Sequence, residues 1–178
     1  MEKLDVYDEN NNFLEYSLDR EEIHNKNLFH RHVSAWIMNL EGKVLMQQRA
    51  FSKKKNPGRW SKTGGHVDAG ETPNEGIKRE VFEEIGLEIP LENINYYEIF
   101  KSKSKENYFS YGYIFITNWK EDEFKLQKEE VERVKYYTIE ELEKIKEDNN
   151  QDFVFCNWPE EGFKRQIKIL KEYRSNLK

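Results

Sequence analysis

The sequence predicts an α/β fold in which a mixed β-sheet lies between helices. Segments with the apolar patterns of strands alternate along the chain with segments of helical period, which is typical of a mixed sheet covered by helices. The chain has 178 residues, enough for one domain with a substantial core, and 14% of them are aromatic. We therefore expect a single domain that covers residues 1–178.

The N-terminal segment, about residues 1–28, is predicted to form a β-hairpin. Leu4–Tyr7 and Phe13–Ser17 have strand composition, and they flank the turn-rich sequence DENNN. Asp19–His24 then has the pattern of a short helical turn. The hairpin is expected to precede the central sheet.

Two strands of the central sheet are predicted next. Phe29–Leu40 alternates and then becomes continuously apolar, as a central strand does, and Lys43–Gln48 pairs back after a Glu41-Gly42 turn. A basic loop follows and contains Lys53 and Arg59 around a Pro-Gly turn. This loop is either a solvated surface or a landing site for phosphates, and Arg49, Lys53 and Arg59 are the candidate phosphate contacts.

The segment after this loop predicts a helix with clear ends. Thr72 is suited to the N-cap, Pro73 to the first helical position, and Glu75 completes a capping box with Thr72. Gly86 is the expected C-terminal stop. An apolar stripe for the core recurs every four residues, at Ile77, Val81 and Ile85.

The same helix concentrates negative charge on one turn. Glu80, Glu83 and Glu84 project to the same side, with Arg79 on their flank. Like charges at this spacing repel by about 0.2–0.5 kcal/mol per pair. A divalent cation reverses that repulsion, and oxygen ligands at this density suit Mg²⁺ or Mn²⁺. Glu84 also borders the apolar stripe, so we expect it to be partly buried.

The stretch GHVDAGETPNEGIKREVFEEIGL, residues 65–87, resembles the Nudix box, Gly-x5-Glu-x7-Arg-Glu-U-x-Glu-Glu-x-Gly-U, where U is bulky and apolar. The chain matches every fixed position of the box, at Gly65, Glu71, Arg79, Glu80, Val81, Glu83, Glu84, Gly86 and Leu87. The resemblance implies an α/β/α sandwich and Mg²⁺-dependent hydrolysis of a nucleoside diphosphate linked to another group.

The resemblance also implies roles for individual residues. Glu80, Glu83 and Glu84 would bind the metal, joined by the carbonyl of Gly64. Arg79 would orient a carboxylate, and Glu71 would brace the loop or helix. The general base is left open. It is either a carboxylate of the box, such as Glu83, or a glutamate of a later loop, with Glu129, Glu130 and Glu132 as candidates.

A second resemblance, to type I isopentenyl diphosphate isomerase, covers about residues 29–66. The shared features are HRH, QQRA followed by SKKK, PGRW and GGH. His30 (or His32) and His66 match histidines that bind a metal in that isomerase. Its proton-transferring cysteine is replaced by Gly64, and NYFSYGYIF lacks its Glu-x-Glu, so the proton-moving pair is missing. Hydrolysis is therefore favoured over isomerisation.

Two interpretations of the histidines are left open. They are either structural, or they bind a metal or a substrate phosphate. His66 is retained as a substrate-binding candidate. A third class of function, a nucleotide-binding Nudix protein without catalysis, is disfavoured because such proteins usually lose box glutamates and none is lost here. Trp60 is expected in the core rather than against a substrate base.

The rest of the chain continues the mixed pattern. Ile94–Lys101, Tyr108–Thr117 and Val134–Tyr137 have strand composition, and Thr138 caps a predicted helix over Ile139–Lys146. An amphipathic C-terminal helix covers about residues 159–175.

The composition limits the classes of partner that we expect for this protein. A net charge of −5 with no dominant basic stripe argues against a stable nucleic-acid partner. No apolar stretch approaches the roughly 20 residues that cross a bilayer. The lone Cys156 excludes an internal disulfide, and no signal peptide is visible, so we expect a cytoplasmic protein. The oligomeric state is left open, and family analogy alone favours a homodimer.

Overall fold

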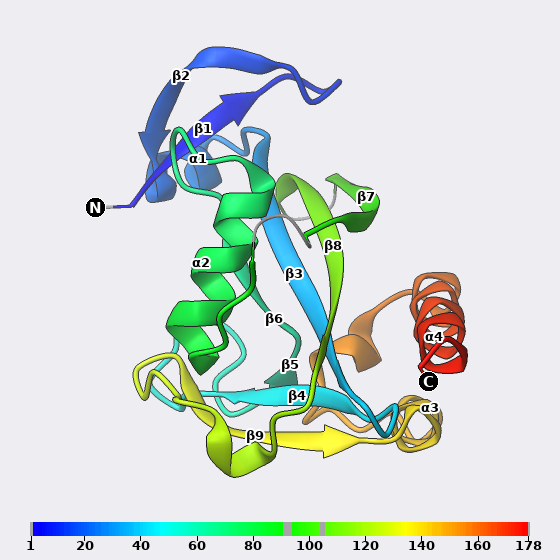
Figure 1. The fold of residues 1–178 in the computed structure, drawn as a ribbon. Coiled ribbons are helices and arrows are strands. Elements are labelled where there is room, and N and C mark those ends of the chain that lie inside the picture. The colour runs from blue at the N-terminus through cyan, green and yellow to red at the C-terminus, as the bar shows by residue number, and fades with distance from the viewer. Residues whose placement is uncertain (1, 91–93, 104–105, 178) are drawn as a thin grey trace. The chain divides into compact units, whose positions relative to one another are not determined.

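The computed structural model describes residues 2–90, 94–103 and 106–177 (Figure 1). The chain forms two compact units, which are described separately. The first unit contains residues 1–35, 63–83 and 87–114, and the second contains residues 36–62, 84–86 and 115–178. Hydrogen bonding assigns β1 and β2 to a two-stranded sheet and β3 to β9 to a seven-stranded sheet.

The N-terminal hairpin of the first unit is confirmed. Strand β1 (Lys3–Tyr7) pairs antiparallel with β2 (Phe13–Asp19), and the short helix α1 (Arg20–Asn25) follows directly (Figure 1). The turn forms because the Asp8 carboxylate accepts hydrogen bonds from the N–H groups of Asn10 and Asn12, both at 2.8 Å. A small core holds the hairpin to α1, and its fully buried members are Leu4, Val6 and Ile23.

The first unit also contains the strand that carries the glycines of the box. Strand β6 (Thr63–His66) pairs antiparallel with the first half of β3 (His30–Asn39), which brings His66 opposite His32. Strands β7 (Tyr96–Lys103) and β8 (Asn107–Thr117) form a second antiparallel pair. These are the strands predicted from the apolar and aromatic runs.

Helix α2 (Pro73–Ile85) begins and ends where the sequence predicts. The Thr72 N–H donates to the Glu75 carboxylate at 2.8 Å, and the Glu75 N–H donates to Thr72 Oγ1 at 3.3 Å, which confirms the capping box. Gly86 ends the helix with φ +74°, a left-handed conformation that favours glycine. The predicted apolar stripe is fully buried, at Ile77, Val81 and Ile85.

The second unit is built on strand β4 (Val44–Arg49). Strands β5 (Trp60–Ser61) and β9 (Val131–Tyr137) pair antiparallel with β4. The start predicted for the last strand, Val134, was wrong by three residues, because the backbone pairing with β4 already begins at Val131. Trp60 is buried and stacks on Phe153 with ring centroids 6.0 Å apart, so its predicted core position is confirmed.

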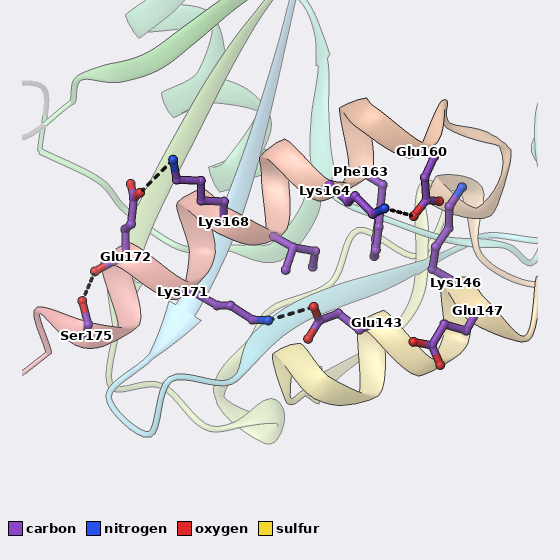
Figure 2. A pocket seen from close by; sticks show the side chains of 11 residues that line it. Glu143, Lys146, Glu147, Glu160, Phe163, Lys164, Lys168, Lys171, Glu172 and Ser175 are labelled. Carbon is purple, nitrogen blue, oxygen red and sulfur yellow. Dashed lines mark hydrogen bonds and ion pairs between the residues drawn. The ribbon is translucent and has the colours of Figure 1, made fainter.

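Two helices follow in the second unit, α3 (Ile139–Glu147) and α4 (Glu160–Ser175). A groove of about 500 Å³ is lined by residues of both helices (Figure 2). Its charged side chains pair with one another, for example Lys171 Nζ with Glu143 Oε1 at 2.8 Å, and Lys146 donates to the carbonyl of Trp158 at 2.7 Å. These contacts connect α3 with α4 and with the segment that precedes α4.

The predicted mixed α/β fold class is confirmed by these elements. Within the described part of the chain, no helix has the length and apolar character needed to cross a membrane.

Candidate functional site

The glycines of β6 allow the box helix to lie close to this strand. Gly64 has φ +149°, and a Cβ built on it would lie 2.2 Å from the carbonyl oxygen of Val33. A Cβ on Gly65 would lie 2.5 Å from the carboxylate of Glu80. Any other residue would collide with backbone at the first position and with the Glu80 carboxylate at the second. Gly64 therefore allows β6 to approach β3, and Gly65 leaves room for the Glu80 carboxylate beside the strand.

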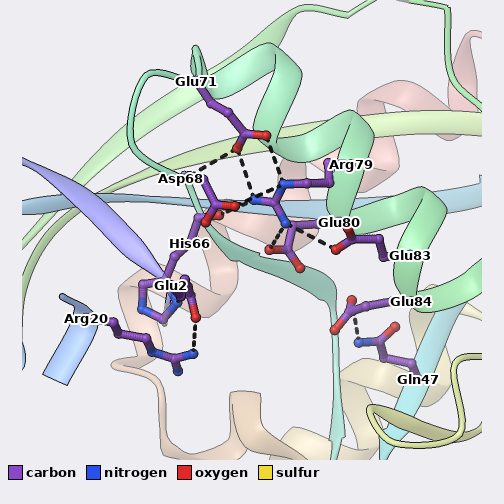
Figure 3. Close-up of polar contacts among 10 residues, drawn as sticks. All are labelled: Glu2, Arg20, Gln47, His66, Asp68, Glu71, Arg79, Glu80, Glu83 and Glu84. Atoms are coloured by element: carbon purple, nitrogen blue, oxygen red, sulfur yellow. Dashed lines mark hydrogen bonds and ion pairs between the residues drawn. The ribbon is translucent and has the colours of Figure 1, made fainter. Parts of the chain in front are cut away.

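Arg79 is the centre of the hydrogen bonds in this site (Figure 3). Its Nη1 donates to Glu80 Oε1 at 2.9 Å and to Glu83 Oε2 at 3.2 Å. Its Nη2 donates to the carbonyl of His66 at 2.9 Å, so one guanidinium joins helix α2 to the end of β6. Arg79 therefore contacts two carboxylates of the box, and its orienting role stays a prediction.

Glu71 holds the other side of the same guanidinium. Arg79 Nε donates to Glu71 Oε1 at 2.9 Å, and Arg79 Nη2 donates to Glu71 Oε2 at 3.0 Å. Glu71 Oε2 also accepts from the backbone N–H of Asp68 at 3.0 Å. The side chain thus connects the loop between β6 and α2 with the arginine, and the bracing role that the resemblance implies for Glu71 stays a prediction.

The electrostatics of Glu80 and Arg79 differ from those of exposed side chains. Burial raises the pKa of Glu80 to about 7, and the neighbouring Arg79 offsets only part of that rise. For Arg79, burial lowers the pKa, but the hydrogen bonds and charges of Glu71 and Glu80 outweigh burial, so its pKa is raised and it stays charged. Glu83 has a half-exposed side chain and is accessible from solvent.

Glu84 has a different environment, in the second unit. Its side chain is only 4% exposed, which confirms the predicted burial, and its Oε2 accepts a hydrogen bond from the Gln47 side-chain amide at 2.9 Å. The carbonyl of Glu84 accepts from the N–H of Gln127 at 3.1 Å. Both contacts fix the end of helix α2 in the second unit.

The donor set of helix α2 fits a hard divalent cation. Glu80 and Glu83 are held by the same guanidinium, and Glu84 follows on the same helical turn. Carboxylates with a backbone carbonyl, here that of Gly64, are the ligands that Mg²⁺ and Mn²⁺ prefer. The position and roles of these four ligands stay a prediction.

Basic side chains in and beside the basic loop of the second unit make specific contacts with neighbouring groups. Lys53 Nζ pairs with Glu130 Oε1 at 2.5 Å, which brings a predicted phosphate contact beside a predicted general base. Arg49 Nε donates to the carbonyl of Lys55 at 3.1 Å. Arg59 Nη2 donates to the carbonyl of Phe153 at 2.8 Å, so part of this guanidinium stabilises the loop itself.

Three histidines of the first unit form a cluster. His24, His30 and His66 come from α1, β3 and β6, and each offers one ring nitrogen within 4.8 Å of the others. Burial lowers the pKa of His30 to about 4 and also lowers the pKa of His66, so these rings are neutral. Neutral imidazoles are able to bind a metal. Glu2 lies beside this cluster, with Oε1 3.4 Å from His66 Nδ1.

Sequence reasoning missed some of these residues. His24 has no local motif, because it lies six residues before His30 and in a different element. Gln47 was counted only as part of a strand, although its amide contacts Glu84. Both contacts connect residues that lie on different elements, and no spacing rule within one helix or strand detects such pairs.

Comparison with known families matches residues 28–158 to the NUDIX domain. An uncharacterized Nudix hydrolase of Clostridium acetobutylicum is 30% identical over 171 residues, which cover 91% of this chain and 80% of that protein. Nudix hydrolase 3 of Arabidopsis thaliana is 31% identical over 151 residues, or 79% of this chain, but the match spans only 20% of that relative. Isopentenyl-diphosphate Delta-isomerase 2 of Photorhabdus laumondii is 27% identical over 158 residues, which cover 86% of this chain and 84% of that protein.

Solved structures show the same fold. A crystal structure from Deinococcus radiodurans has a TM-score of 0.63 at 21% identity and covers 79% of this chain and 86% of that one. A bifunctional NMN adenylyltransferase/ADP ribose pyrophosphatase from Francisella tularensis, complexed with AMP and a Mn ion, has a TM-score of 0.56 at 21% identity and covers 81% of this chain and 41% of that one. These similarities confirm the predicted fold.

Proposed function

Because the chain belongs to the Nudix family and is a hydrolase of that family, we propose that it cleaves the diphosphate linkage of a nucleoside diphosphate joined to another group. Water attacks phosphorus in the proposed reaction, and the enzyme depends on Mg²⁺ or Mn²⁺. The substrate is proposed to be a small nucleotide derivative.

One observation carries this proposal: a single guanidinium, that of Arg79, holds Glu71, Glu80 and Glu83 together. Charge-assisted hydrogen bonds of this kind fix carboxylates in orientation as well as position. A surface helix with a random acidic patch would not aim its carboxylates at one arginine. The geometry supports carboxylates that are arranged in advance for a cation.

When bound, the cation would neutralise negative charge on the diphosphate and lower the pKa of a bound water. The residues of this chain would position the cation and the substrate. Glu80, Glu83, Glu84 and the carbonyl of Gly64 would hold the cation, while Arg79 would orient two of those carboxylates and Glu71 would fix Arg79. Basic side chains stabilise the negative charge that develops on the phosphoryl oxygens, with Arg49, Lys53, Arg59 and His66 as the proposed contacts.

For the general base, two positions remain. Glu83 is accessible on the box helix, and Glu130 lies in the turn before β9, where it pairs with Lys53 of the basic loop. The ion pair at 2.5 Å fixes the position of the Glu130 carboxylate beside Lys53. In Glu130→Gln, loss of turnover with unchanged affinity for Mn²⁺ would assign the base to Glu130. Unchanged turnover would exclude Glu130 and leave Glu83, Glu129 and Glu132 as candidates.

The histidine cluster supports a metal or phosphate role for His30 and His66, because their rings converge with that of His24. This arrangement also keeps isopentenyl diphosphate isomerase activity as the second candidate function. A substrate screen with isopentenyl diphosphate separates the two. Isomerisation without phosphate release would favour the isomerase. Metal content and turnover of His66→Ala are compared with those of the unaltered chain, and unchanged values of both would make the histidines structural.

The test of the main proposal is the formation of nucleoside monophosphate, measured by chromatography, from nucleoside triphosphates, nucleoside diphosphate sugars and dinucleotides in the presence of Mg²⁺ or Mn²⁺. We expect this product from at least one class, and none when EDTA is added. Glu83→Gln should lose this activity. Glu147→Gln is the matched control, because Glu147 is an exposed glutamate at the end of α3, and it should retain activity.

Silence of the unaltered chain across this whole panel would contradict the hydrolase proposal. Binding of nucleotides without turnover would then support a nucleotide-binding protein of the same fold.

A further inference from the structure

The N-terminal hairpin contacts the loop of the box, residues 67–70, through its backbone. Leu4 of β1 forms an antiparallel bridge with Asp68, and the N–H of Ala69 donates to the carbonyl of Lys3 at 2.8 Å. Strand β1 therefore pairs with β2 on one edge and with this loop on the other. The hairpin is part of the surroundings of the box.

Asp5 joins the two sides of this contact with its carboxylate. Its Oδ2 accepts from the N–H of Gly70 at 3.0 Å, and its Oδ1 accepts from Ser17 Oγ at 2.6 Å. The residue is only 9% exposed, between two fully buried neighbours, Leu4 and Val6. A carboxylate in such a place is costly unless it is hydrogen-bonded, and these two donors supply the bonds.

The contact made by Asp5 leads directly to the proposed metal ligands. Gly70 has φ +83° and immediately precedes Glu71. Glu71 holds Arg79 through two hydrogen bonds, and Arg79 in turn holds Glu80 through its Nη1. A hydrogen bond to the Gly70 N–H thus fixes the backbone from which the Glu71 side chain extends.

We propose that Asp5 is a positioning residue for the box, acting through Gly70 and Glu71 on Arg79 and its carboxylates. The inference rests on the proposed function, since it assumes that those carboxylates bind a divalent cation. It extends the functional unit from the box, residues 65–87, to a strand about sixty residues earlier in the chain.

A purely structural role for Asp5 makes a different prediction. If Asp5 only stabilised the hairpin, its bond to Ser17 would matter as much as its bond to Gly70, and its loss would affect stability alone. The chain offers a matched pair for this comparison. Ser17→Ala removes the bond on the hairpin side, whereas Asp5→Ala removes both bonds.

The experiment measures Mn²⁺ affinity directly, by titration without substrate, and turnover in parallel on the best substrate of the panel. Asp5→Ala should weaken Mn²⁺ binding and turnover by about 10-fold or more, the usual effect of losing a residue that orients metal ligands. Ser17→Ala should stay within about 2-fold of the unaltered chain in both measurements, since the Gly70 contact remains. Asp5→Asn keeps an acceptor oxygen and should restore much of the loss.

A folded Asp5→Ala variant that binds Mn²⁺ as tightly as the unaltered chain would overturn the proposal. A Ser17→Ala variant that loses as much Mn²⁺ affinity and turnover as Asp5→Ala would also overturn it. If Asp5→Ala does not fold, Asp5→Ser replaces it, because its short hydroxyl keeps a polar group but does not reach Gly70. The same 10-fold criterion then applies. Failure of the unaltered chain to bind Mn²⁺ would instead contradict the proposed function itself, which separates the two failures.

Discussion

Arg79 and Glu71 are joined by two parallel hydrogen bonds, from Nε to Oε1 at 2.9 Å and from Nη2 to Oε2 at 3.0 Å. This fork fixes the plane of the guanidinium and leaves Nη1 directed at Glu80 and Glu83. The positions of the proposed metal ligands therefore depend on a planar side chain that bonds on several sides at once.

Arg79→Lys should therefore impair function although the charge is kept. An ammonium on a flexible stem cannot bond Glu71 in a fork and also reach Glu80 and Glu83. We expect a loss of about 10- to 100-fold in Mn²⁺ affinity or turnover, with the circular dichroism spectrum unchanged. A lysine variant with full Mn²⁺ affinity and turnover would show that the arginine is only a surface charge.

Glu83→Gln and Glu84→Gln should each abolish metal-dependent turnover while the fold survives. The amides are close in size to the carboxylates but carry no charge for a cation. Glu84→Gln would also place an amide against the amide of Gln47, so the free energy of unfolding is measured beside turnover. Near-normal activity of either variant would remove that glutamate from the proposed site.

Gly64→Ala should destabilise the protein, because the added Cβ would lie 2.2 Å from the Val33 carbonyl oxygen and the backbone φ is +149°. We expect a loss of at least about 2 kcal/mol in the free energy of unfolding, measured with urea. Gly162→Ala is the control, since nothing lies within 4 Å of its added Cβ in helix α4. Equal stability of the two variants would contradict the close approach at β6.

The buried imidazole of His30 predicts a pH dependence of stability. Burial lowers its pKa from 6.5 to about 4, so below pH 6.5 the unfolded chain binds a proton that the folded chain does not. The contribution of neutral His30 to the free energy of unfolding is complete above pH 6.5. It is lost as the pH falls to 4, by up to about 3 kcal/mol. Urea unfolding in EDTA across this range should show a weaker pH dependence in His30→Asn. Parallel curves for both proteins would contradict the prediction.

Much of the site was predictable because its signals are local. The capping box of Thr72 and Glu75, the stop at Gly86 and the buried stripe of α2 all depend on residues within a few positions of one another. The spacing of Glu80 and Glu83 beside Arg79 also follows from one helix, and the structure places all three in contact.

The remaining features depend on which elements pack together. Asp5 meets Gly70 across 65 positions, and Lys53 meets Glu130 across 77. Spacing along one element carries no signal for such pairs. His24 was missed for the same reason, since its cluster exists only where α1, β3 and β6 converge.

The most direct measurement is anomalous diffraction from a crystal soaked with Mn²⁺ and a non-hydrolysable nucleoside diphosphate compound. The account predicts a manganese peak bound by Glu80, Glu83 and Glu84, with Arg79 still bonded to Glu71 and the diphosphate oxygens on the ion. A fully soaked crystal with bound nucleotide but no manganese at these carboxylates would contradict it.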